Sequence, residues 1–169
     1  AKENKLLIIE DAAQGLGAKY KNKGIGTFDI GATISFYPAK NLGCFGDAGA
    51  FVTNSKKMYE QVLLLRDHGR SEDGSFVRWG FNSRLDNLQA AFLNFKLDYY
   101  SDEIKRRREI AALYHNKLKD LNQLSLPPKP DLNSNYFDVY QNYELEAERR
   151  DELKNFLSQN GIGTIIQWN

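Results

Sequence analysis

Short apolar runs along the first third of the chain predict strands. Residues 6–9 (LLII) are continuously apolar, a pattern typical of a strand in the middle of a parallel sheet that helices cover. Residues 31–36 and 49–53 predict two further strands. Ser55 follows and can cap a helix, which we expect over residues 56–66. This order of strands and helices indicates an α/β domain.

Helical periodicity dominates the middle of the chain. After an irregular, aromatic segment at residues 67–84, we expect a helix whose apolar face holds Leu85, Leu88, Phe92 and Phe95. A second helix, from Ser101, places an apolar stripe at Ile104, Ala111, Tyr114 and Leu118. The basic run at residues 105–108 lies beside this stripe, and acidic neighbours dilute its charge, so we expect an ordinary solvated helix face there.

The last third of the chain predicts a small α+β unit attached through the long helix. Apolar residues alternate as in a strand at Phe137, Val139, Tyr143 and Leu145. Residues 150–159 predict a helix closed by Asn160 and Gly161, and residues 164–166 predict another strand.

Composition and charge exclude several classes of function. With 41% hydrophobic and 27% charged residues, the chain is expected to fold rather than remain disordered. Lys and Arg number 23 against 22 for Asp and Glu, which provides no electrostatic basis for nucleic-acid binding. No apolar run approaches the ~20 residues that cross a bilayer, so no membrane partner is expected. A single cysteine, Cys44, and two distant histidines lead us to expect a cytoplasmic protein without a metal site.

A lysine and a carboxylate are the candidate chemical groups. Asp11 ends the first apolar run, and Lys40 lies in the glycine-rich loop at residues 38–47. Both are expected at the carboxyl edge of the sheet, where α/β proteins bind ligands. A deprotonated lysine can form a Schiff base, and a carboxylate facing it could keep a pyridinium nitrogen protonated. These residues alone leave the commoner alternative open, in which both are solvated charges, and no dinucleotide fingerprint, Walker loop or serine elbow is present.

Three short segments of the first fifty residues form a distinctive combination: EDAAQ (residues 10–14), SFYPAKNLG (35–43) and GDAGA (46–50). Together they resemble the pyridoxal-phosphate-dependent sugar aminotransferases of the DegT/DnrJ/EryC1/StrS family. Segments similar to the same family follow in order at LRDHG (65–69), GFNSRLD (80–86) and RREIA (107–111). The resemblance therefore covers nearly the whole chain.

The resemblance implies roles for five residues, each with a purely structural role as the alternative. Lys40 would form the Schiff base with pyridoxal 5'-phosphate and carry the proton, and Asp11 would pair with the pyridinium nitrogen. Gln14 would contact the 3-oxygen side of the ring, and Ser35 would bind the cofactor phosphate. Asn82 would reach a phosphate in the neighbouring subunit of a homodimer.

The form of the lysine motif narrows the implied substrate. The sequence SFYPxKNLG resembles family members that aminate nucleotide-linked 3-keto-6-deoxyhexoses, whereas 4-keto enzymes tend to resemble SFHxxK. Residues 138–144 and 163–169 are also most similar to the 3-amino-sugar branch. We therefore expect glutamate to aminate a dTDP-linked sugar, in amino-sugar synthesis for lipopolysaccharide or surface polysaccharide. The alternatives are a 4-keto aminotransferase, a dehydratase of the family, in which histidine replaces the lysine, and a non-catalytic module that binds a nucleotide or a partner.

The resemblance also implies a fold and an incomplete chain. Residues 1–98 would form the C-terminal part of an aspartate-aminotransferase-like (fold type I) large domain, and residues 99–169 the connecting helix and part of a small α+β domain. Family members are considerably longer and have an upstream phosphate-binding turn and a ring-stacking aromatic residue. We therefore expect this chain alone to bind the cofactor weakly, to lack activity and to self-associate through unpaired strand edges.

Overall fold

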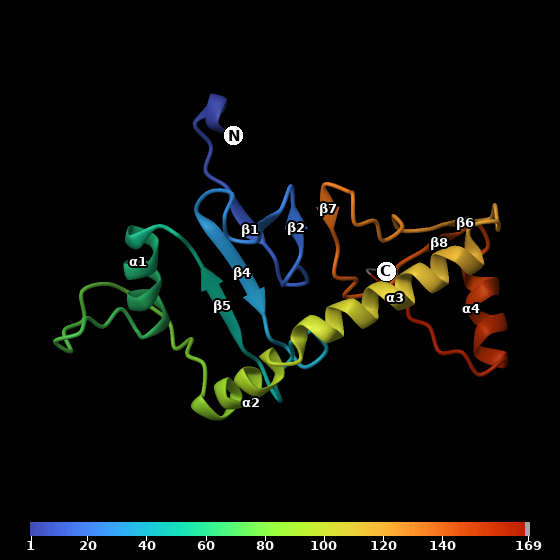
Figure 1. The fold of residues 1–169 in the computed structure, drawn as a ribbon. Coiled ribbons are helices and arrows are strands. Elements are labelled where there is room, and N and C mark those ends of the chain that lie inside the picture. The colour runs from blue at the N-terminus through green and yellow to red at the C-terminus, as the bar shows by residue number, and fades with distance from the viewer. Residues whose placement is uncertain (168–169) are drawn as a thin grey trace.

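A three-stranded sheet lies in the N-terminal half of the protein. The structure, a computed structural model, describes residues 1–167, except for the side chain of Lys2. After a 3₁₀ turn (Lys2–Asn4), the sheet is built from β1 (Ile9–Asp11), β4 (Gly31–Ser35) and β5 (Gly49–Val52), in the order β1-β4-β5 (Figure 1). The β1 and β4 strands run parallel, with Asp11 opposite Thr33, and β5 is antiparallel to β4. The strands expected at residues 31–36 and 49–53 are confirmed.

The first strand differs from its prediction in both position and burial. It begins at Ile9 rather than Leu6, and Leu6 and Leu7 are 61% and 76% exposed. Within the described residues β1 pairs only with β4, so it is an edge strand and not a central one. The apolar run therefore lacks the second strand neighbour and the covering helices that such a sequence normally has.

Three helices follow the sheet. The predicted helix over residues 56–66 is α1 (Lys56–Arg66), and the Ser55 side chain caps it by accepting a hydrogen bond from the Met58 N–H at 3.3 Å. The next two, α2 (Asn87–Leu97) and the long α3 (Tyr100–Leu118), confirm the two helical patterns. On α2, however, Leu88 and Phe95 are exposed and Leu93 is the buried residue.

The main apolar cluster lies where the loop after β4 meets α2 and α3. It contains Leu42, Cys44, Leu93 and Tyr100, all less than 9% exposed. The thiol of Cys44 donates to the Phe36 and Gly46 carbonyls at 3.0 Å each, so this cysteine has a structural role. The core therefore supports the loop that carries Lys40.

The C-terminal third of the chain returns to the N-terminal third. The strand β7 (Tyr136–Phe137) pairs with β2 (Lys19–Tyr20), which pairs in turn with β3 (Lys23–Gly24). A second pair joins β6 (Leu124–Ser125) to β8 (Glu146–Ala147), and the predicted last helix is α4 (Arg150–Gln159). In Figure 1, α3 runs from the sheet side of the molecule to these C-terminal elements.

Two strand predictions in this region are wrong. The alternating pattern at residues 137–145 forms a strand only at β7, which ends at Phe137, and the φ of 49° at Tyr140 prevents the extended backbone from continuing through the rest of the pattern. Residues 164–166 form no strand in the described part of the chain. The similarity noted at residues 163–169 extends to positions 168–169, which lie outside the described residues.

The basic run at residues 105–108 is not the uniformly solvated face that we expected. Arg106 is exposed, but Arg108 is only 9% exposed and its guanidinium lies 4.0 Å from the centre of the Phe137 ring. The Arg108 Nη1 atom donates to the Asp138 carbonyl at 2.7 Å. Charge pattern alone misses this arrangement because a long arginine side chain can pack its stem and still satisfy its charged head.

We expect Arg108→Ala to lower the free energy of unfolding by about 2 kcal/mol, because it removes a buried charge-assisted hydrogen bond and the packing on Phe137. Arg106→Ala is the matched control, because Arg106 forms an exposed ion pair with Glu109. Urea unfolding of both variants measures the difference. Equal midpoints for the two variants would contradict a structural role for Arg108.

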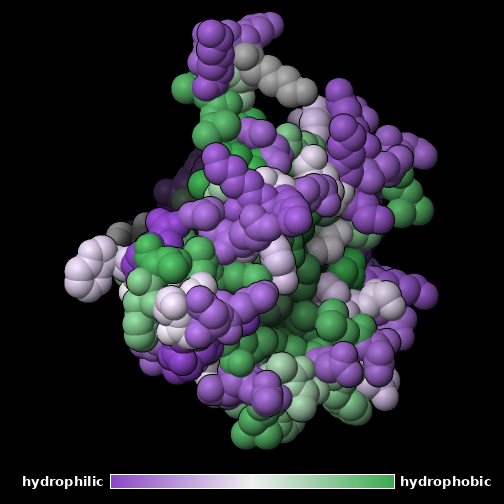
Figure 2. All heavy atoms as spheres, turned by 90° about the vertical axis from the view of Figure 1, so that its left-hand side faces the viewer, coloured by the Kyte–Doolittle hydropathy of each residue, from purple (hydrophilic) through white to green (hydrophobic). Residues whose placement is uncertain are grey.

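The described fold has an unusually large accessible surface. A compact monomer of 19.4 kDa exposes roughly 8,500 Å², whereas this chain exposes 12890 Å². Figure 2 shows apolar side chains at the surface on the face that carries α1, and Trp79 is 96% exposed. Within the described residues, no helix is long and apolar enough to cross a membrane.

Candidate active site

The parallel pairing of β1 and β4 brings two candidate residues to one edge of the sheet. Asp11 is the last residue of β1, and Ser35 is the last residue of β4. Because Asp11 is in register with Thr33, Ser35 lies two residues farther along the neighbouring strand. Gln14 follows β1 in the turn that leaves the same edge. The register of the two strands is therefore enough to place Asp11, Ser35 and Gln14 at the same edge of the sheet, as we expected for the candidate residues.

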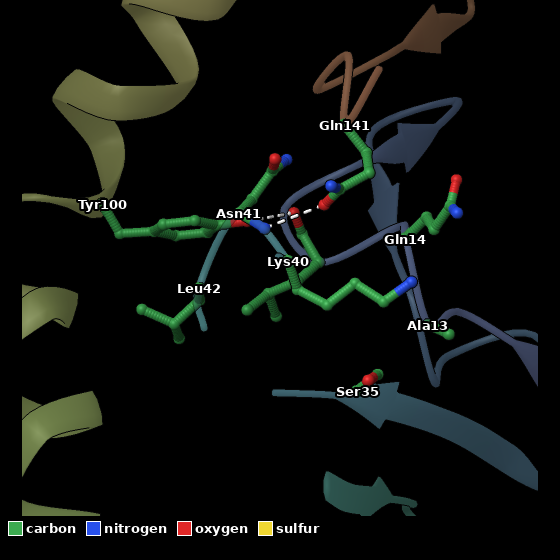
Figure 3. A pocket seen from close by; sticks show the side chains of 9 residues that line it. Ala13, Gln14, Ser35, Lys40, Asn41, Leu42, Tyr100 and Gln141 are labelled. Carbon is green, nitrogen blue, oxygen red and sulfur yellow. Dashed lines mark hydrogen bonds between the residues drawn. The ribbon is translucent and has the colours of Figure 1, made fainter. Parts of the chain in front are cut away.

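A small pocket collects three of the five predicted residues. Lys40, Gln14 and Ser35 line it, together with Ala13, Leu16, Asn41, Leu42, Tyr100 and Gln141. In Figure 3 the side chain of Lys40 extends toward Ala13 and Gln14, and Ser35 lies beside it on β4. Lys40 is half-buried, and within residues 1–167 its ammonium has no hydrogen-bond or ion-pair partner. An unpaired amine that faces an amide and a hydroxyl is suited to bind a ligand with a carbonyl or phosphate group.

The loop that carries Lys40 is held by contacts along its whole length. The Lys40 N–H donates to the Tyr37 carbonyl at 2.8 Å, and the Phe36 N–H donates to the Ala48 carbonyl at 2.8 Å, where the loop closes. From α2, the ammonium of Lys96 donates to the Gly43 carbonyl at 2.6 Å. These contacts fix the backbone on both sides of the candidate lysine.

Gly43 is required because two carbonyls of the loop approach its α-carbon. A methyl group there would lie 2.4 Å from the Pro38 oxygen and 2.7 Å from the Tyr37 oxygen. Since both obstacles are backbone atoms, the loop must shift to admit any side chain. Gly43 thus allows the loop to turn tightly enough to hold Lys40 in its position.

We expect Gly43→Ala to lower the free energy of unfolding by about 2 kcal/mol and to displace Lys40, because the new methyl group overpacks the loop. The matched control is Gly24→Ala, where nothing lies within 4 Å of the added carbon. Thermal unfolding of both variants checks the first effect, and the rate at which an amine reagent modifies Lys40 checks the second. A Gly43→Ala variant indistinguishable from Gly24→Ala would refute this account of the loop.

Two adjacent carboxylates at the end of β1 have different uses. The Glu10 carboxylate accepts hydrogen bonds from the Gly26 and Phe28 N–H groups at 3.0 and 3.4 Å, so it holds the neighbouring turn. Asp11 is exposed, and in the described part of the chain its carboxylate accepts one hydrogen bond, from the Ala13 N–H to Oδ1 at 3.2 Å. Asp11 itself does not line the pocket, but Ala13, two residues later, does. Of the two, Asp11 is the carboxylate that remains available to a ligand.

Asn82 lies outside this pocket. It is exposed in the irregular segment after α1, where its backbone bridges to Asp67 and its Oδ1 atom accepts from Nε of Arg84 at 3.1 Å. Within one chain, therefore, the structure brings Lys40, Gln14 and Ser35 together and leaves Asn82 apart.

Sequence reasoning missed three residues that line the pocket. Tyr100 begins α3 and donates its hydroxyl to the Leu16 carbonyl at 2.7 Å, and burial raises the pKa of this hydroxyl above its usual value of 10. Asn41 has a buried side-chain amide with no hydrogen-bond partner in the described structure. Gln141 contacts the lysine loop from a segment 100 residues away. Asn41 and Gln141 both lie in segments that carry the family resemblance, at residues 35–43 and 138–144, but no local pattern indicates that Gln141 contacts the lysine loop.

Comparisons with known proteins agree over nearly the full chain. The sequence model of the DegT/DnrJ/EryC1/StrS aminotransferase family matches residues 1–169. A dTDP-3-amino-3,4,6-trideoxy-alpha-D-glucose transaminase from Streptomyces venezuelae is 41% identical over 164 residues, which are 96% of this chain and 42% of that protein. A protein named "Pleiotropic regulatory protein" from Geobacillus stearothermophilus is 39% identical over 169 residues, 99% of this chain and 45% of that protein.

A solved structure has the same fold. The crystal structure of S. venezuelae DesV in complex with a ketimine intermediate is similar with a TM-score of 0.90 and 40% identity, over 96% of this chain and 43% of that one. The predicted fold class is thereby confirmed: the chain is part of an α/β, fold type I aminotransferase structure. The chain spans less than half the length of the relatives that it matches.

Proposed function

Because this chain belongs to the DegT/DnrJ/EryC1/StrS aminotransferase family, whose members depend on pyridoxal 5'-phosphate, we propose that its protein transfers an amino group to a nucleotide-linked keto sugar. The observation that carries this proposal is the Lys40 amine, which has no partner among residues 1–167 and shares one pocket with Gln14 and Ser35 at the edge where Asp11 ends β1. A catalytic lysine needs this combination of partial burial and open access.

The donor groups at this edge fit pyridoxal 5'-phosphate. Lys40 offers an amine to the aldehyde, and Asp11 offers a carboxylate that, within the described residues, accepts a single backbone N–H. Ser35 accepts a weak hydrogen bond from the Tyr37 N–H at 3.3 Å, which leaves its own hydroxyl hydrogen free to donate to a phosphate. When bound, the cofactor supplies an aldehyde and an electron-withdrawing ring, through which an amino group passes from donor to acceptor.

Each residue then has a defined task. Lys40 would hold the cofactor through Nζ, and its amine would serve as the group that moves a proton at the reacting carbon. Asp11 keeps the ring nitrogen protonated, because a carboxylate beside it favours the charged form. Gln14 orients the ring from the side of its 3-oxygen, and Ser35 fixes the phosphate. The division of the chain into residues 1–98 and 99–169 belongs to the same proposal.

The proposed substrate is a dTDP-linked 3-keto-6-deoxyhexose, with glutamate as the amino donor. The name of the S. venezuelae relative, a transaminase of a dTDP-3-amino sugar, supports the nucleotide and the position of amination. The SFYPxKNLG form of the lysine loop supports the same choice. A cytoplasmic location is part of this proposal, because the single thiol, Cys44, suits a reducing compartment.

We also propose a homodimer. The exposed position of Asn82 outside its own pocket supports it, because in a dimer this side chain could reach the partner's cofactor phosphate.

A non-catalytic regulator that uses the same pocket is the second candidate. The name of the G. stearothermophilus relative favours it. Such a protein would bind a nucleotide or partner at the sheet edge without transferring an amino group.

The two candidates are separated by an assay of the natural protein that carries these residues. The protein would be incubated with pyridoxal 5'-phosphate, glutamate and either a dTDP-3-keto- or a dTDP-4-keto-6-deoxyhexose. We expect a visible absorption band from the bound cofactor, 2-oxoglutarate release, and an amino sugar of the 3-keto substrate detected by mass spectrometry. Nucleotide binding with neither absorbance nor amino sugar would support the regulator, and amination of the 4-keto sugar alone would overturn the proposed substrate.

A further inference from the structure

The side-chain amide of Gln141 brackets Lys40 through the backbone. Its Oε1 atom accepts a hydrogen bond from the Asn41 N–H at 2.8 Å, and its Nε2 atom donates to the Ala39 carbonyl at 2.8 Å (Figure 3). The two backbone groups belong to the residues immediately before and after Lys40. One side chain therefore holds both peptide units that flank the candidate lysine.

A primary amide is the group that suits this arrangement. It offers an acceptor and a donor side by side, as the backbone of a neighbouring strand does, and it carries no charge. A carboxylate at the same place could accept from Asn41 but could not donate to the Ala39 carbonyl. The choice of glutamine at position 141 is therefore explained by the two contacts that it makes.

The segment that carries Gln141 is itself held in an unusual conformation. Tyr140 has a φ of 49°, which is costly for an aromatic residue and persists only where its surroundings impose it. The Tyr140 hydroxyl donates to the Pro128 carbonyl at 2.6 Å, and its N–H donates to Oδ1 of Asp138 at 2.9 Å. These contacts direct the chain so that the next residue, Gln141, faces the lysine loop.

The long helix completes the support. The Arg107 guanidinium on α3 donates to the carbonyls of Tyr140 and Gln141 at 3.3 and 3.2 Å. A continuous series of hydrogen bonds thus leads from α3 through Gln141 to the peptide units on either side of Lys40. Because Gln141 lies 100 residues from Asn41 in sequence, this contact ties the C-terminal third of the chain directly to the lysine loop.

From this geometry we propose that Gln141 is a positioning residue, which sets the direction of the Lys40 side chain by clamping the Ala39 carbonyl and the Asn41 N–H. The proposal rests on the proposed function, in which Lys40 is the reactive amine. Gln141 acts through the backbone, so it controls where Nζ lies rather than how the sugar binds.

The clamp can be measured without cofactor by hydrogen exchange of the Asn41 amide. We expect Gln141→Ala to accelerate this exchange about tenfold, because one hydrogen bond is lost. Gln141→Glu keeps the acceptor and should leave the exchange close to that of the unmodified protein. Asn142→Ala is the matched control, since the hydrogen bond of the Asn142 side chain in the described structure goes to Glu144 and not to the lysine loop. Equal exchange at Asn41 in Gln141→Ala and Asn142→Ala would overturn the clamp.

The positioning role is measured in the natural protein by separating kcat from KM. Both Gln141→Ala and Gln141→Glu should lower kcat by about tenfold or more, because each releases the Ala39 carbonyl and a small displacement of a reacting group is costly. The KM for the keto sugar should stay within about twofold, since Gln141 does not act through sugar binding. A rise in KM at unchanged kcat would refute positioning and indicate a sugar-binding role. If the unmodified protein transfers no amino group, the proposed function fails, while the exchange of Asn41 still decides whether the clamp exists.

Discussion

Replacement of Lys40 by alanine is expected to abolish amino transfer in the natural protein, with a loss of at least about 10³ in rate, or about 4 kcal/mol in the activation barrier. The physical reason is that the variant loses both the amine that holds the cofactor and the group that moves the proton. Within the described residues, Lys40 is the lysine that lines the pocket, so no neighbouring amine can replace it.

Reduction with borohydride in the presence of pyridoxal 5'-phosphate locates the reactive amine directly. Peptide mapping should find the pyridoxyl group on Lys40 in the unmodified protein and no labelled peptide from this loop in Lys40→Ala. Lys57→Ala, on the exposed surface of α1, is the matched control and should retain both labelling and activity. A pyridoxyl group found mainly on another lysine would show that the assignment of Lys40 is wrong.

Replacement of Asp11 by asparagine is expected to leave the cofactor bound but to slow proton removal from the amino donor by about 10³-fold. A neutral amide cannot keep the ring nitrogen protonated, so the ring withdraws electrons poorly. The substitution is structurally mild, because asparagine retains the Oδ1 atom that accepts the Ala13 N–H at 3.2 Å. The turn after β1 should therefore survive, and the loss can be assigned to charge.

Single-turnover spectroscopy with glutamate measures this effect, because it follows the chemical step separately from product release. The control is Asp29→Asn, which changes another carboxylate that accepts a backbone N–H, that of Ile8 at 2.7 Å, away from the pocket. It should react at the normal rate. Glutamate turnover at the normal rate in Asp11→Asn would rule out the proposed role of this carboxylate.

Local sequence determines the elements that depend on near neighbours. Ser55 precedes α1 and caps it, and the helical periodicity of residues 101–118 appears as α3. The short-range motifs also identified Lys40, Gln14 and Ser35, which the structure gathers in one pocket. The cap, the helix and the shared position of these residues were predictable because caps, periodicity and the carboxyl ends of parallel strands follow from spacing along a short stretch of chain. The cofactor-binding roles of the three residues stay predictions.

Burial of the apolar runs could not be predicted in this way. Residues 6–9 have the composition of a covered strand, yet Leu7 is 76% exposed, because burial depends on what lies beside β1 and not on its own residues. The same limit applies to Arg108, whose guanidinium is enclosed because β7 brings Phe137 and the Asp138 carbonyl against α3. Charge and hydropathy describe what a residue prefers, while the tertiary fold decides what surrounds it.

The bracket around Lys40 is the clearest case of a feature that only the folded chain contains. Sequence motifs predict that Lys40 is the reactive lysine, but nothing within a few residues of it predicts that Gln141 will hold the two adjoining peptide units. That contact requires the positive φ at Tyr140, the arginine of α3 that supports it, and the pairing of β7 with β2. The local motifs thus predict the chemical role of the lysine. The orientation of its loop depends on hydrogen bonds between segments 100 residues apart, which form only when the chain is folded.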